Sequence, residues 1–193
     1  MNFEELIVRN RSYRRFQQNQ RIEHKTLVEL VDIARRTPCG GNRQPLRYAI
    51  VQQPEKCAQL FAHLRWAALL RGWGGPKEGE RPAAYILILN DTTVSTHSDT
   101  EVGIAAQSMS LAATERGLGG CMIGSIDRAK VVQEFAIPDQ YQLALVLALG
   151  VPAETCVLEA AEIGGSVAYY RDATGVHHVP KLPLSEVLIN LKS

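Results

Sequence analysis

Two uninterrupted apolar runs constrain the fold of this chain most strongly. Residues 85–89 read YILIL, and residues 143–149 read LALVLAL. Runs of this length without alternating polar residues are typical of β-strands that are covered on both faces. A shorter run at residues 48–51 and another at residues 121–123 predict two further strands. The sequence therefore predicts a sheet whose main strands are buried on both sides.

Residues with helical spacing separate these strands. Asn2 is predicted to cap a first helix, with Glu5 completing a capping box. Phe3, Leu6 and Ile7 fall on one face of this helix, which predicts a buried stripe. Further helices are predicted at residues 25–36, 54–64, 101–116 and 127–135.

The chain changes character near residue 153. From there on, short apolar pieces alternate with polar ones. Residues 167–170 and 176–179 flank a turn at residues 172–175 and predict a hairpin, and residues 184–191 form a last amphipathic segment. So little core of its own indicates an arm that packs on something else, such as a second subunit. We therefore expect one domain over residues 1–193, with residues 153–193 as a C-terminal extension or dimer arm.

Bulk properties exclude several classes of protein. A formal net charge of +1 argues against a general nucleic-acid binder. The longest apolar runs are too short to span a membrane. The first five residues are acidic where a secretory signal would be basic. The four cysteines are dispersed without a CxxC pair, so we expect reduced thiols, no metal site and a cytoplasmic location.

The common catalytic constellations are missing from the sequence. It has no G-x-S-x-G elbow, no Walker loop and no H-E-x-x-H motif. His177 and His178 are neighbours on a predicted strand, so they point to opposite faces and are poorly placed to share a metal. The glycine cluster at residues 117–125 follows a helix, whereas a dinucleotide fingerprint follows a strand. Cys39 remains open as a nucleophile, although no motif supplies a partner base.

The chain offers a set of binding groups instead. Residues 10–16 contain three guanidinium groups and a serine hydroxyl, which suit a phosphate, although a solvated basic face would look similar. Gly40 and Gly41 allow a backbone to approach a flat ligand, although a plain turn explains them equally well. Asn42 and Gln44 add amide groups. This inventory fits an enzyme whose chemistry belongs to a phosphorylated cofactor.

Four segments together resemble the flavin-dependent nitroreductase family. They are RSYRRF at residues 11–16, PCGGNRQP at residues 38–45, GLGG at residues 117–120 and IGS at residues 123–125. The resemblance covers nearly the whole chain, with the segments in the family's order and at similar separations. It implies an α+β fold: a central mixed β-sheet flanked by helices, in a homodimer that exchanges its C-terminal arms.

The resemblance also implies an FMN site at the dimer interface. Residues 11–14 would hold the phosphate and ribityl chain, and residues 38–44 would contact the flavin from the other subunit. Residues 123–125 would lie against the isoalloxazine, and a late lysine would return to the phosphate. The residues that the resemblance assigns to FMN are Arg11, Ser12, Arg14, Pro38, Cys39, Gly40, Asn42, Gln44, Ile123, Gly124, Ser125 and Lys181.

The implied activity is that of an FMN-dependent NAD(P)H oxidoreductase. In a ping-pong cycle, NADH or NADPH would deliver a hydride to flavin N5, and a nitroaromatic, a quinone or a similar acceptor would then take the electrons. No catalytic side chain is expected, because the flavin carries the chemistry. Two alternatives stay open: an FMN-binding carrier or sensor, and a specialised flavoenzyme such as a dehalogenase. The chain departs from the family pattern at Asn10, Leu182 and Pro183, where relatives often carry basic residues.

Overall fold

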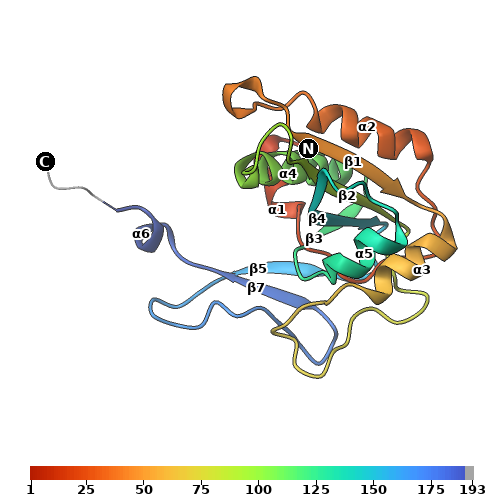
Figure 1. Cartoon of the computed structure of the whole chain (residues 1–193). Coiled ribbons are helices and arrows are strands. Elements are labelled where there is room, and N and C mark those ends of the chain that lie inside the picture. Colours follow the sequence, from red (N-terminus) through yellow and green to blue (C-terminus); the bar gives the residue numbers. More distant parts are fainter. Residues whose placement is uncertain (190–193) are drawn as a thin grey trace, which may run out of the picture. The chain divides into compact units, whose positions relative to one another are not determined.

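The computed structural model describes residues 1–189 of the chain. It contains two compact units. Residues 1–66 and 74–153 form the first unit, and residues 67–73 together with the chain from Glu154 onward form the second. The elements of both units are drawn in Figure 1.

A four-stranded sheet forms the centre of the first unit. Its strands are β1 (Leu46–Val51), β2 (Ala84–Asp91), β3 (Gly119–Ile123) and β4 (Tyr141–Gly150), in the order β1-β2-β4-β3. Neighbouring strands are antiparallel, while Ser12 forms a parallel bridge with Gly120, so the outer edge of the sheet is mixed. All four predicted strands are present, and all eight residues of β2 are buried, as their apolar run predicts.

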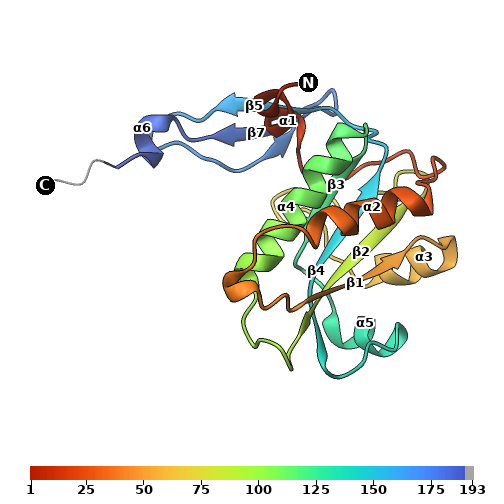
Figure 2. The same cartoon turned by 90° about the horizontal axis from the view of Figure 1, so that it is seen from above.

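Helices cover both faces of this sheet (Figure 2). The helices of the first unit are α1 (Phe3–Arg9), α2 (His24–Ala34), α3 (Pro54–Ala62), α4 (Asp99–Glu115) and α5 (Arg128–Glu134). Successive residues of β2 point to opposite faces. Ile86 and Ile88 join the core that α2 and α4 cover, whereas α3 and α5 lie on the other side. Among the described helices, none has the length and apolarity that a bilayer crossing demands.

Helix α1 confirms one prediction and contradicts another. Its capping box is present, because the Asn2 side chain accepts from the Glu5 amide and the Glu5 carboxylate accepts from the Asn2 amide. The predicted buried stripe is wrong for the chain by itself. All seven residues of α1 are described and none is buried: Phe3 is 71% exposed and Ile7 37%. Helical spacing shows that a face is apolar, but it does not say which surface covers that face.

The second unit contains a small three-stranded sheet. Its elements are β5 (Cys156–Ala160), β6 (Tyr170–Arg171), β7 (His177–Lys181) and the short helix α6 (Leu184–Val187). The predicted hairpin is present as β6 and β7, although β6 has only two residues. Strand β5 pairs in parallel with β7 and was not predicted. Part of the predicted segment 184–191 lies outside the described residues.

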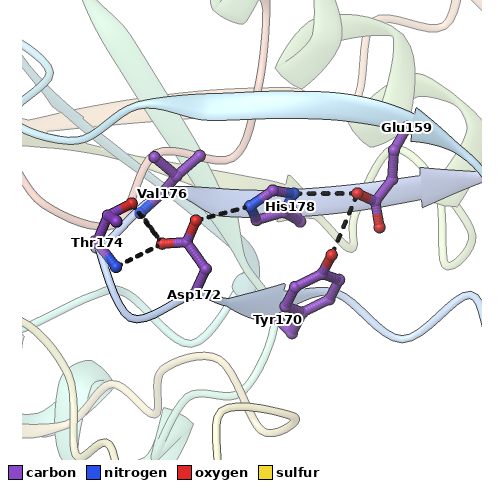
Figure 3. A network of polar contacts seen from close by, with 6 residues as sticks. All are labelled: Glu159, Tyr170, Asp172, Thr174, Val176 and His178. Carbon is purple, nitrogen blue, oxygen red and sulfur yellow. Dashed lines mark hydrogen bonds and ion pairs between the residues drawn. The ribbon is translucent and has the colours of Figure 1, made fainter.

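A network of polar side chains joins the three strands of this sheet (Figure 3). His178 on β7 has Nδ1 3.0 Å from Glu159 Oε2 on β5 and Nε2 3.2 Å from Asp172 Oδ2. The Tyr170 ring stacks on the His178 ring at 4.7 Å, and its hydroxyl donates to Glu159. Asp172 Oδ1 also accepts from the backbone and hydroxyl of Thr174, which closes the turn. The pairing of these short strands therefore depends on charged groups.

Candidate functional site

The arginine-rich segment after α1 is held against the edge of the main sheet. Ser12 bridges Gly120, and the Tyr13 N–H donates to the Gly120 carbonyl at 3.0 Å. Ser12 itself is exposed, and Arg11 and Arg14 are half-buried. Arg11 donates to the Ile7 carbonyl at 2.6 Å and Arg14 to the Ser12 carbonyl at 3.2 Å. The backbone bonds hold this segment at the start of β3, and the two guanidinium groups each donate to a carbonyl of the N-terminal chain.

Asn10, one of the positions where the resemblance implies a basic residue, takes part in packing. Its Nδ2 donates to Thr114 Oγ1 at 2.9 Å, and its Oδ1 accepts from Gln107 Nε2 at 3.3 Å. Both partners belong to α4, so Asn10 ties the end of α1 to that helix. The short amide reaches two polar partners here, which gives this position a structural role in this chain.

The other end of β3 carries a second group of predicted residues. Ile123 is the last residue of the strand and is buried, whereas Gly124 and Ser125 are exposed. The Ser125 carbonyl accepts from the Arg65 N–H at 3.0 Å, which fixes the turn. From Gly120, which Ser12 bridges, to Ile123 there are three steps of about 3.3 Å each, which span about 10 Å. One strand therefore has the arginine-rich segment paired near its start and an exposed backbone turn at its end.

The Pro38–Gln44 loop is a tight turn with a strained backbone. Gly40–Asn42 form one turn of 3₁₀ helix. Gly41, Asn42 and Gln44 have φ of 56°, 50° and 52°, in the left-handed region that non-glycine residues rarely adopt. The Gln44 N–H donates to Cys39 Sγ at 3.2 Å and thereby holds this conformation. Strain of this kind persists at sites where the surrounding structure fixes it, often for binding.

A hydrogen bond to Glu101 of α4 holds this loop against the rest of the first unit. Its Oε1 accepts from the Gly40 N–H at 3.1 Å, and a Cβ at Gly40 would lie 3.0 Å from the same oxygen. Only glycine therefore leaves this contact undisturbed. No sequence motif pointed to Glu101, because its partner is a backbone group 61 residues away.

A cavity of about 130 Å³ opens beside the loop. Predicted residues Pro38, Cys39 and Gln44 line it, together with Tyr48 and Glu101. Burial, and to a smaller degree the nearby Cys39, raises the pKa of Tyr48 to about 12. Its hydroxyl is therefore protonated at neutral pH and available as a donor. Sequence analysis missed Tyr48, although its place at the start of the strand that follows the loop is a usable signal.

The predicted residues thus fall into separate groups. The first unit brings residues 11–14 together at one end of β3, residues 123–125 at the other end, and residues 38–44 around the cavity. Lys181 is an exposed residue of β7 in the second unit. Within residues 1–189 no group of histidine, cysteine and acidic side chains could hold a metal ion.

Comparisons with known proteins show the family and the fold of the chain. Residues 7–151 match the model of the nitroreductase family. A nitroreductase family protein from Clostridium difficile 630 is 25% identical, with complete coverage of both chains and a TM-score of 0.70. A protein from Desulfovibrio desulfuricans, solved in complex with FMN, is 24% identical over 100% of this chain and 99% of its own, with a TM-score of 0.69. An FMN-dependent nitroreductase from Clostridium difficile R20291 is 20% identical over 77% of this chain and 87% of its own, with a TM-score of 0.64.

Proposed function

The chain belongs to the nitroreductase family, and we propose that it is an FMN-dependent oxidoreductase that takes electrons from NADH or NADPH. One observation carries this proposal: Ser12 is bridged to Gly120. The bridge sets the guanidinium cluster at the start of the same strand that ends in the exposed Gly124–Ser125 turn. A ligand with a phosphate at one end and a flat ring at the other matches these two ends.

The residues present fit FMN by their chemistry. Arg11 and Arg14 supply guanidinium donors for a phosphate, and the exposed Ser12 hydroxyl supplies another. Gly124 and Ser125 offer an exposed backbone turn to a ring. We further assign Lys181 to the phosphate. When bound, FMN would accept a hydride from the nicotinamide and pass electrons to a nitroaromatic, a quinone or a similar acceptor.

The chain's own residues would bind and orient, without an acid–base side chain. The fixed Pro38–Gln44 loop would present Pro38, Cys39, Gly40, Asn42 and Gln44 to the flavin bound by a second copy of the chain. Ile123 would add apolar contact beside the ring. The strained φ angles of Asn42 and Gln44 support a binding role for this loop, because strain is retained where a fixed backbone is useful.

A homodimer follows from the same proposal. Helix α1 exposes Phe3, Ile7 and Val8, and the end of the second unit exposes a run that includes Leu184 and Ile189. Exposed apolar surfaces of this kind mark protein–protein contacts. Sedimentation velocity should therefore report a dimer, and a stable monomer would contradict it. The four cysteines are dispersed in the sequence without a CxxC pair, which supports a reducing compartment, and we propose the cytoplasm.

The decisive experiment is a spectrum followed by an assay. The purified protein should be yellow or should become so with added FMN, and it should oxidise NADH or NADPH when a nitroaromatic or quinone is supplied. A colourless protein that takes up no FMN would refute the proposal. Bound FMN without nicotinamide oxidation would favour a carrier or sensor. Fast flavin reduction with slow nitroaromatic turnover would favour a specialised flavoenzyme.

A further inference from the structure

A short antiparallel contact sets Arg65 opposite Ser125 in the first unit. Leu64 forms an antiparallel bridge with Ile126, and the Arg65 N–H donates to the Ser125 carbonyl at 3.0 Å. In this register the residue after Leu64 faces the residue before Ile126. Residues that are directly opposite in antiparallel strands have Cβ atoms about 4.5–5.5 Å apart. The backbone of Arg65 is therefore fixed beside the Gly124–Ser125 turn.

Burial shows which way the Arg65 side chain points. Its neighbours Leu64 and Trp66 are 4% and 7% exposed, whereas Arg65 and Ser125 are both exposed. Side chains of an extended segment alternate between its two faces. Leu64 and Trp66 therefore point into the first unit, and Arg65 points outward on the same face as Ser125.

The Arg65 guanidinium has no counter-ion, whereas the carboxylates that follow the turn are already paired. Within residues 1–189 this guanidinium takes part in no ion pair and no hydrogen bond. Asp127 Oδ2 lies 3.3 Å from Lys130 Nζ, and Glu134 Oε1 lies 3.0 Å from His63 Nε2. Exposed arginines are commonly just solvated, so an unpaired charge alone assigns no function. The position of this one beside the turn is what gives it a role.

The inference rests on the proposed function, in which the flavin ring lies against the Gly124–Ser125 turn. A substrate that exchanges electrons with the flavin must lie on that ring, within reach of an arginine side chain opposite Ser125. A guanidinium fork matches the two oxygens of a carboxylate. We propose that Arg65 is a specificity-determining residue, which favours electron acceptors that carry a carboxylate on the nitroaromatic or quinone ring.

An acceptor matches this charge better than the nicotinamide donor does. Substituents of a nitroaromatic or a quinone are attached directly to the ring that accepts electrons. The phosphates of NADH and NADPH are separated from the nicotinamide ring by a ribose, so they extend further from the flavin. A charge one side chain away from the ring turn is therefore placed for the acceptor.

Binding of two isosteric ligands to the FMN-loaded protein tests the proposal. Para-nitrobenzoate and para-nitrobenzamide have the same shape, but only the first carries a negative charge, and the flavin absorption spectrum reports the binding of either. The parent should bind para-nitrobenzoate more tightly. Arg65→Met, which keeps an unbranched side chain and removes the charge, should lower the affinity for para-nitrobenzoate about fivefold, the upper end for an exposed ion pair. Its affinity for para-nitrobenzamide should not change, and Arg65→Lys should recover part of the loss.

Two controls separate a local contact from a general effect of charge. Arg36→Met removes an exposed arginine that is paired with Asp32, and it should keep the parent affinity for both ligands. Added sodium chloride should weaken the binding of para-nitrobenzoate more in the parent than in Arg65→Met, because salt screens exposed charges. The turn itself should keep its structure in each Arg65 variant, because the bond to Ser125 comes from the backbone N–H.

Several results would overturn the inference while FMN remains bound. They are equal affinity of the parent for the two ligands, no detectable binding of para-nitrobenzoate, equal losses for both ligands in Arg65→Met, and a loss in Arg36→Met as large as that in Arg65→Met. A lower kcat/KM for NADH or NADPH in Arg65→Met, with unchanged affinity for para-nitrobenzoate, would assign the charge to the donor and overturn it too. A protein that takes up no FMN would refute the proposed function and this inference with it.

Discussion

The two units hold their strands together in different ways. In the first unit, β2 is buried at every residue and pairs with a neighbour on each side. In the second unit, no residue of β5 is buried, as the described residues show, and charged side chains around His178 join the strands. Burial of apolar surface does not depend on protonation, whereas ion pairs do. Packing therefore decides the stability of the first unit, and protonation contributes to that of the second.

The largest expected effect on stability comes from shortening a buried side chain of the main sheet, which leaves a cavity. Leu147 of β4 is 0% exposed, so Leu147→Ala should lower the free energy of unfolding by about 2–5 kcal/mol. Leu158→Ala is the matched control in the second unit, where Leu158 is 38% exposed on β5 and should cost much less. Denaturant unfolding measures both. Equal losses of stability in the two variants would contradict the difference between the two units.

A steric change at the edge of the main sheet should have a smaller effect. A Cβ at Gly119 would lie 2.6 Å from the Tyr13 ring and 2.8 Å from Pro152. Gly119→Ala should therefore cost about 1–3 kcal/mol of stability and weaken FMN retention, because Tyr13 lies between Ser12 and Arg14.

A Cβ at Gly103 would meet nothing within 4 Å, so Gly103→Ala in α4 should instead stabilise the chain by about 0.5–1 kcal/mol.

Removing one guanidinium group that we assign to the phosphate should weaken cofactor binding without affecting the fold. Arg14→Ala should weaken FMN binding by about 1–3 kcal/mol, the scale of a charge-assisted hydrogen bond. Fluorescence titration of the flavin measures the change. Arg36→Ala, which removes an exposed arginine paired with Asp32, is the control and should bind FMN as the parent does. Unchanged FMN affinity in Arg14→Ala would contradict the assignment.

The smallest effect is a pH dependence confined to the second unit. Hydrogen bonds with Asp172 and then Glu159 raise the pKa of His178 above its ordinary 6.5, so its stabilisation is complete below about pH 6.5 and is lost as pH rises through the raised value. Hydrogen bonds from Thr174 and then His178 lower the pKa of Asp172 from 3.8 to about 2, so that contribution is lost as pH falls through about 2. Between these limits His178 and Asp172 are both charged.

Hydrogen-exchange protection of the β6–β7 hairpin, measured against pH, tests this dependence. Protection should decrease above the pKa of His178, while protection in β2 should not change over the same range. His178→Gln should remove the dependence, because the amide does not titrate. A hairpin whose protection is constant from pH 5 to about pH 9 would contradict the role of His178.

The elements of the first unit could be predicted because their signals are local. The run at residues 85–89 became β2, and Asp127 caps α5 by accepting from the Lys130 N–H. Strand β5 was missed because its five residues carry no periodic signal and its partner β7 lies some twenty residues away. The predicted buried stripe of α1 was wrong for a similar reason: the sequence of a helix shows which face is apolar, but it does not show which surface covers that face.

The residue types of the candidate site could be predicted from the sequence, but the contacts that hold these residues in place could not. Guanidinium groups and a hydroxyl at residues 11–14 suit a phosphate, but a solvated basic face would look similar, so the assignment rested on the resemblance to the nitroreductase family. Ser12 pairs with Gly120, which lies 108 positions further along the chain. Glu101 accepts a hydrogen bond from the backbone N–H of Gly40, and a backbone donor of this kind leaves no mark in the sequence. Such long-range partners have no local pattern, so only the folded chain reveals them.

The bridge between Ser12 and Gly120 has a consequence for solubility. Strand β3 is one of the two outer strands of the main sheet, and an open edge of this kind invites pairing with another chain. The N-terminal segment occupies part of that edge, where the Tyr13 N–H donates a hydrogen bond to the Gly120 carbonyl. Loss of this segment would leave that carbonyl open to a neighbouring molecule. The segment that contains the residues we assign to FMN therefore also covers part of a sheet edge.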